Sequence, residues 1–333
     1  MLRFFHRSLQ QPLSHLVSKL PVLVLLTLFL AQLLFLNLPA VDAQEANKAD
    51  DKKPKIPAPV TKKLTTKDGV LLSCRFYPGI LKKNSVPIMI VHGWEERGSQ
   101  YSALALTLQK RGHAVIVPDL RGHGLSTKRK TGNGTATIDR DRLNKQGLLA
   151  MVLDLEACKV FLRQQNNEGL LNLEQLCIVG SDLGALVALE WAVRDWNAPR
   201  LPSLKQGQDV KALVLISPPQ SFKGLTAQIA YTHPQVSKLS TLIISGRESA
   251  RTYSDARRIY NRLEKARGKV PDSQGKTLYN YGCKTAKQGA ALFTRGVDPN
   301  PLALISSFIR LRLENRKADY PWTDRTNPFN ESN

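Results

Sequence analysis

The residues with the clearest chemical meaning lie where a predicted buried strand meets a predicted helix. Residues 176–179 form an apolar run, and the next five residues place Gly180 and Gly184 on either side of Asp182. Strand, tight turn and buried helix in this order are typical of a nucleophile elbow, which raises one side chain above a sheet. Glycines two positions before and after the apex leave room for such a strained turn. The spacing therefore predicts that Asp182 is the apex residue.

An aspartate at this apex limits the possible chemistry. Ionised, it can attack an alkyl carbon without a base, but hydrolysis of the resulting ester needs a base that activates water. A serine at the apex would instead need a histidine, and that histidine a carboxylate. The helpers of Asp182 must come from loops that end other strands.

Alternating strands and helices predict how those loops come together. An α/β fold is expected, with a mostly parallel sheet of about eight strands, helices on both faces and a short lid at 221–238. Carboxyl ends of parallel strands meet at one edge, which is where ligands bind. The expected strands are 64–66 and 70–76 as a hairpin, then 87–91, 114–117, 176–179, 210–216, 241–244 and 277–281, with 131–137 as a loop.

Three segments together resemble the α/β-hydrolase superfamily, in particular the branch of serine aminopeptidases and monoacylglycerol lipases. They are His92-Gly93-Trp94 after the strand at 87–91, the Asp-x-Arg-Gly-x-Gly-x-Ser stretch at 119–126, and the elbow. The resemblance covers nearly everything from Leu64 onward. It implies a His-Gly oxyanion turn at His92 and Gly93, with backbone N–H groups of Trp94 and Leu183 as the oxyanion donors.

The same resemblance implies a degenerate catalytic triad. The nucleophile position is Asp182. The acid position after the seventh strand falls on Ser249, with Glu248 next to it, and the histidine position after the eighth strand falls on Gln288. No histidine follows His233. Since an amide cannot act as a base, the machinery for hydrolysis is incomplete.

Two functions remain open from these residues. One is an α/β-hydrolase-fold protein that has lost turnover and acts as a binding module for an unknown small molecule. The other is an active hydrolase of ester, peptide or alkyl substrates, such as epoxides or haloalkanes, that uses Asp182. Neither requires a cofactor, and the sequence contains no metal-ligand spacing.

The first 63 residues are expected to lie outside the fold. Residues 1–43 combine a basic start, an apolar run and small residues at 41 and 43, which is typical of an export signal peptide. An uncleaved membrane anchor is the alternative, because the apolar run approaches the length of a membrane span. Residues 44–63 are predicted to be a Lys/Pro-rich linker, 64–314 the hydrolase domain and 315–333 a polar C-terminal tail.

The formal net charge of +21 is high. Such a charge attracts anionic molecules, and an anionic polymer or membrane surface is an expected partner. No motif for specific nucleic-acid binding accompanies the basic residues. Cys158 and Cys177 are predicted to be buried core residues rather than parts of a disulfide framework.

Overall fold

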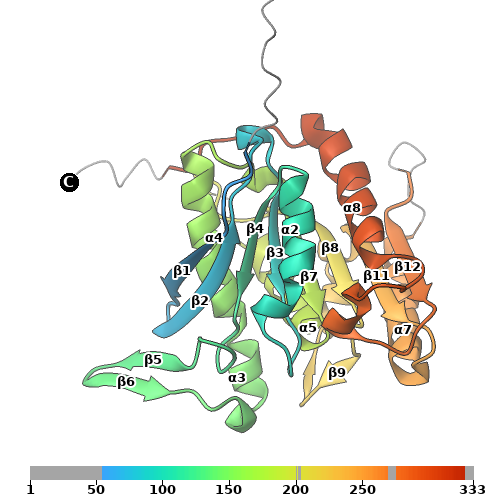
Figure 1. Ribbon diagram of the computed structural model, residues 1–333, viewed down its shortest axis with the longest axis horizontal. Helices are drawn as coiled ribbons and strands as arrows, with labels where there is room; N and C mark the ends of the chain where they lie inside the picture. Colours follow the sequence, from blue (N-terminus) through green and yellow to red (C-terminus); the bar gives the residue numbers. More distant parts are fainter. Residues whose placement is uncertain (1–54, 200, 202–203, 269–274, 327–333) are drawn as a thin grey trace, which may run out of the picture. The chain divides into compact units, whose positions relative to one another are not determined.

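The computed structural model describes residues 55–199, 201, 204–268 and 275–326. A 10-stranded sheet runs through it, with the order β12-β11-β8-β7-β3-β4-β2-β5-β6 and β1 paired with β2 (Figure 1). Pairing is parallel from β12 to β4, and antiparallel from β4 to β6 and between β1 and β2. The predicted fold class is confirmed, with two strands more than expected.

The main sheet and the helices occupy the following residues. The strands are β1 Val60–Thr65, β2 Val70–Tyr77, β3 Pro87–Val91, β4 Ala114–Pro118, β5 Lys128–Thr131, β6 Gly134–Thr137, β7 Leu176–Ser181, β8 Val210–Ile216, β11 Ser240–Gly246 and β12 Leu278–Cys283. The α-helices are α2 Ser102–Lys110, α3 Lys145–Leu149, α4 Val152–Asn167, α5 Leu183–Trp196, α6 Gln228–Thr232, α7 Ala250–Arg267 and α8 Pro301–Arg312.

Each face of the sheet packs against its own set of helices. Successive residues of a strand point to opposite faces, so Met89 and Val91 of β3 join the core under α4, α5 and α7. Ile88 and Ile90 join the core under α2 and α8. This explains why β3, β4 and β7 are buried at every position and are apolar apart from Ser181 at the end of β7.

The parallel strands bring five loops to one edge of the sheet. His92 follows β3, Asp182 follows β7, Ser217 follows β8, Glu248 follows β11 and Gln288 follows β12. The register supports this, because Val91 lies beside Gly180 and Ser181 beside Ile216. The predicted convergence of loops at this edge is therefore confirmed.

A prediction that fails is the loop at 131–137. β5 and β6 form an exposed hairpin that extends the sheet beyond β2. Thr131 pairs with Gly134, so Gly132 and Asn133 make a two-residue turn. A Gly-Asn pair at the two turn positions is a known hairpin signal, but the flanking strands have no apolar face, which is why the hydrophobic pattern did not identify them.

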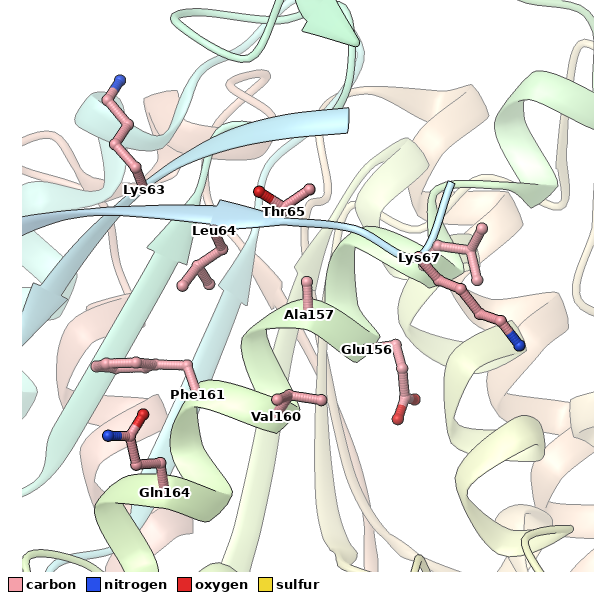
Figure 2. Close-up of a pocket in the computed structure, with 10 residues that line it drawn as sticks. Lys63, Leu64, Thr65, Lys67, Glu156, Ala157, Val160, Phe161 and Gln164 are labelled. Carbon is pink, nitrogen blue, oxygen red and sulfur yellow. The ribbon is translucent and has the colours of Figure 1, made fainter. Parts of the chain in front are cut away.

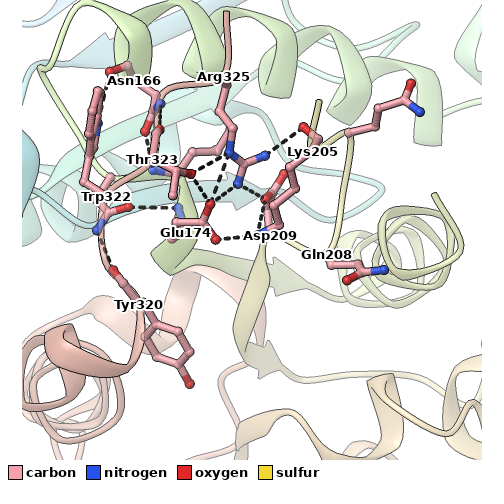
Figure 3. A network of polar contacts seen from close by, with 12 residues as sticks. Asn166, Glu174, Lys205, Gln208, Asp209, Tyr320, Trp322, Thr323 and Arg325 are labelled. Carbon is pink, nitrogen blue, oxygen red and sulfur yellow. Dashed lines mark hydrogen bonds and ion pairs between the residues drawn. The ribbon is translucent and has the colours of Figure 1, made fainter. Parts of the chain in front are cut away.

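Both ends of the folded domain reach further than predicted. β1 begins at Val60, inside the predicted linker 44–63, and Gln109 Nε2 donates to Pro57 O at 2.9 Å. The predicted tail 315–333 packs against the domain as far as the structure describes it. Arg325 is 3% exposed and is held by Glu174 and Asp209 (Figure 3).

Two further segments differ in detail from the prediction. The helix expected at 147–165 is divided into α3 and α4 around Ala150 and Met151. The lid segment holds a two-stranded hairpin, β9 Ser221–Phe222 and β10 Leu225–Thr226, followed by α6.

A signal peptide and, as the alternative, a membrane anchor were predicted at residues 1–43. The predicted signal peptide lies outside the described residues. Every helix within those residues is too short or too polar to cross a bilayer.

Candidate functional site

The turn at Asp182 has the strained geometry that the glycine spacing predicts. Asp182 has φ 46° and ψ −122°, a conformation that non-glycine residues rarely adopt. A Cβ at Gly180 would lie 2.5 Å from Gly184 O, and one at Gly184 would lie 2.4 Å from Val91 O. Both contacts are with backbone that cannot move aside. The close approach of α5 to β3 and β7 therefore requires both glycines.

The carboxylate of Asp182 lies against the predicted oxyanion donors. Trp94 N donates to Asp182 Oδ2 at 3.3 Å. Burial raises the pKa of Asp182, the N–H groups of Leu183 and Trp94 act to lower it, and the nearby Glu96 and Glu95 carboxylates raise it further. The donors that would receive a substrate oxyanion thus already face a carboxylate.

Asp182 and Gln288 line the same cavity of about 300 Å³. Gln288 makes only neutral contacts there: its Nε2 donates to Gly246 O at 3.3 Å, and its Oε1 accepts from Ser217 Oγ at 2.7 Å. Ser217 Oγ also accepts from Gly289 N at 3.1 Å. The histidine position is therefore filled by an amide that is fixed between two loops.

The acid position is not brought into this cavity. Ser249 precedes α7, and its hydroxyl contacts Thr252 Oγ1 at 3.2 Å. Glu248 is exposed. Thr252 lines the cavity, whereas Ser249 and Glu248 do not. The structure therefore brings together the nucleophile and histidine positions, Asp182 and Gln288, but not the acid position.

Glu96 is a carboxylate beside Asp182 that the sequence reasoning missed. Its Oε2 accepts from Gly93 N at 2.6 Å and from Tyr101 Oη at 2.5 Å, and its Oε1 accepts from Ala290 N at 2.7 Å. A Cβ at Gly93 would lie 2.8 Å from Glu96 Oε2 and 3.2 Å from Asp182 Oδ2, so the two carboxylates are close neighbours. Both oxygens of Glu96 are engaged, and it ties the loop after β3 to the segment after β12.

The sequence contained one signal for Glu96. It is a carboxylate three residues after Gly93, directly beyond the His-Gly turn. Its partner Ala290 lies 194 residues away, and no local pattern identifies that contact.

The histidines of the two motifs, His92 and His123, shape loops. His92 Nε2 accepts from Leu120 N at 3.0 Å, so its Nδ1–H donates to Gly93 O at 2.7 Å. Burial lowers the pKa of His92 to about 4. His123 contacts Trp94 O at 2.7 Å and Arg121 O at 3.0 Å. Both rings hold the Trp94 loop in place and lie outside the lining of the cavity.

Trp94 is covered from the lid. Phe222 packs against its ring at 5.2 Å between centroids, and Lys223 Nζ lies 4.1 Å from the ring centroid. His233, the lid histidine, contacts Asn197 Oδ1 at 3.0 Å and does not line the cavity. The lid thus supplies apolar and cationic groups to this edge, but no base.

A larger hollow of about 510 Å³ lies between β1 and α4 (Figure 2). It is lined by Leu64, Val160 and Phe161 together with polar side chains at its rim. Its one carboxylate, Glu156, accepts from Trp191 Nε1 at 3.1 Å. No elbow residue contributes to it, so its size does not make it the reactive site. Within the described residues no group of three His, Cys, Asp or Glu side chains is placed to hold a metal ion.

A mostly parallel sheet, an elbow after β7 and a His-Gly turn after β3 are the defining features of the α/β-hydrolase fold, and this chain has that fold. Residues 86–238 match the family model of the alpha/beta hydrolase fold. An esterase of Pyrococcus furiosus has a TM-score of 0.55 at 15% identity, over 77% of this chain and 91% of the esterase. The acylaminoacyl peptidase of Pyrococcus horikoshii has a TM-score of 0.52 at 16% identity, over 79% of this chain and 43% of the peptidase.

In sequence, a stretch of 70 residues is 37% identical to the non-heme chloroperoxidase of Burkholderia pyrrocinia. It covers 21% of this chain and 24% of that protein. These similarities establish the fold and leave the activity to the site, because one fold supports many functions.

Proposed function

We propose that this protein is an α/β-hydrolase-fold protein that has lost hydrolytic turnover and binds a small molecule at the elbow. The observation that carries the proposal is the position of the Asp182 carboxylate against the N–H of Trp94. Oxyanion donors accelerate acyl transfer only if they are free to receive charge that develops in the transition state. A carboxylate already in that place repels a second negative charge.

The absence of a usable base at this site supports the same proposal. Gln288 has no titratable group, and both oxygens of Glu96 accept hydrogen bonds from fixed donors. Glu248 is exposed outside the cavity. Glu95, the other carboxylate of the lining, is exposed at the rim of the cavity. An ester of Asp182, once formed, would therefore persist, because no group among the described residues is both held beside it and free to activate water.

The alternative function is an active hydrolase in which Asp182 attacks an alkyl carbon. It is favoured by one observation, the cavity of about 300 Å³ that Asp182 lines. The two functions differ in the fate of an alkyl electrophile, which is either retained as one adduct or turned over repeatedly.

We expect 1-bromobutane or styrene oxide to give one stable adduct per chain by intact-mass measurement, and p-nitrophenyl acetate to give no turnover above the Asp182→Asn variant. The adduct should be absent in Asp182→Asn. It should remain in Glu95→Gln, which removes an exposed carboxylate from the rim of the same cavity. Sustained turnover that Asp182→Asn abolishes would establish the active hydrolase instead.

We further propose that residues 1–43 direct export of the protein and are then removed, on the basis of their basic, apolar and small-residue pattern. The mature chain isolated from the native host should begin at Gln44, which N-terminal sequencing measures. A chain that begins at Met1 in the membrane fraction would show that the segment is an anchor.

A further inference from the structure

We propose that the outward face of α7 binds a soluble phosphate-bearing molecule, at a site separate from the elbow. A groove of about 450 Å³ runs along this face. It is lined by Arg247, Tyr253, Ser254, Arg257, Arg258 and Asn261. The three arginine side chains come from the loop before the helix and from its third turn, and they share one hollow.

Among the described residues, the guanidinium groups of this groove have no carboxylate partner. Within the described part of the chain, none of the ion pairs involves Arg247, Arg257 or Arg258. α7 carries six basic residues and two acidic ones. Both acidic residues accept from neutral donors: Asp255 from Gln220 Nε2 at 2.8 Å, and Glu264 from Tyr260 Oη at 2.9 Å. The positive charge of the groove is thus left for an external anion.

The groove is backed by the edge of the sheet. A Cβ at Gly282 of β12 would lie 2.8 Å from Tyr253 Cε2 and 3.1 Å from Arg247 Cβ. Arg247 N also donates to Cys283 O at 2.9 Å. Because Gly282 lets these two residues lie close against β12, one wall of the groove is formed before any ligand arrives.

The polar groups along the groove suit phosphate. Guanidinium groups donate in a planar fork that matches two phosphate oxygens, and Ser254, Tyr253 and Asn261 add neutral donors. Three guanidiniums within one hollow fit a molecule with more than one negative charge. The net charge of +21 also raises the local concentration of such molecules.

A solute fits this face better than a membrane surface. Helices that lie in a membrane interface bury large apolar side chains among the lipids. α7 exposes none of the large apolar side chains found exposed in the described residues. The site is also concave, whereas a bilayer presents a broad, flat surface.

This groove shares no lining residue with the Asp182 cavity. The proposal of phosphate binding at α7 can therefore be tested independently of whether the elbow has lost turnover.

The test is titration calorimetry of the full chain with inorganic pyrophosphate at constant ionic strength. Arg257→Gln combined with Arg258→Gln should weaken binding by about tenfold or more, which corresponds to 1.4 kcal/mol. The matched control, Arg251→Gln combined with Lys265→Gln, removes the same charge from exposed positions of α7 outside the groove and should change binding less than about twofold. Arg258→Lys, which keeps the charge but loses the fork, should lie between them.

Two results would overturn the proposal. If both double variants weaken pyrophosphate binding equally, the attraction is a diffuse property of the basic surface. The second result would be that the wild-type chain does not bind pyrophosphate but does bind phosphatidylglycerol vesicles, and that the double variant Arg257→Gln with Arg258→Gln no longer binds these vesicles. In that case the face binds a membrane rather than a solute. All variants change exposed side chains, so unchanged thermal unfolding checks that each one is folded.

Discussion

Replacing Arg325 with leucine is expected to lower the free energy of unfolding by about 3–5 kcal/mol. Arg325 is buried, and its Nη2 donates to Asp209 Oδ1 at 2.6 Å and to Glu174 Oε1 at 2.5 Å (Figure 3). Asp209 is fully buried. Lys159 and Lys205 also contact these carboxylates, and together with Arg325 they balance the charges of Glu174, Asp195 and Asp209. Without Arg325 this buried cluster keeps one excess negative charge, which costs far more than the pair contributes as a whole.

Urea unfolding of wild type and variant measures this change. Arg316→Leu is the matched control, since Arg316 pairs with Asp319 at 2.6 Å on the surface and should contribute no more than about 1 kcal/mol. Equal, small losses in the two variants would mean that residues 320–326 do not hold the domain together. A change in slope as well as midpoint would indicate partial unfolding of this segment alone.

Lowering the pH from 7 to 4 is expected to destabilise the protein, with about 3 kcal/mol of the loss due to His92. Burial lowers the pKa of this imidazole to about 4, from 6.5 for a free histidine, and the neighbouring His123 lowers it further, while Gly93 O, Asp119 and Glu96 oppose the shift. The unfolded chain therefore takes up the proton first. The stabilising contribution is fully present above pH 6.5 and is lost as the pH falls towards 4.

The hydrogen bonds explain why the folded protein resists this proton. Nε2 of His92 accepts from Leu120 N, so a proton on Nε2 would face another donor. His92→Asn removes the titration and should flatten the dependence of stability on pH between 6.5 and 4, although its stability at pH 7 will be lower. Identical slopes for wild type and His92→Asn would contradict the assignment.

Much of the fold follows from local patterns. The strands β3, β4, β7 and β8 are apolar apart from Ser181 and Lys211, and the predicted bounds lie within two residues of those observed. The elbow was predictable because its glycines are required by contacts within a few residues of the turn and with the adjacent strand. Backbone geometry of this kind requires glycines at fixed spacing, and that spacing is visible in the sequence.

Segments without a periodic pattern of apolar residues were not predicted. The hairpin of β5 and β6 is exposed at every position, so neither of its faces shows alternation. Arg325 appeared to belong to a polar tail, since nothing near it in the sequence indicates Glu174 or Asp209, more than 100 residues away.

The residues and their spacing alone predict an α/β-hydrolase fold with an aspartate at the elbow and an amide at the histidine position. Residue identity decides those points, because a carboxamide has no group that titrates near neutral pH and so cannot act as a base. The three-dimensional structure was needed to show that the Asp182 carboxylate lies against the N–H of Trp94 and that Glu96 lies beside it. It also shows that Ser249 and Glu248 stay outside the cavity. These are contacts between loops that end different strands, and their distances depend on how the whole sheet packs rather than on any local pattern.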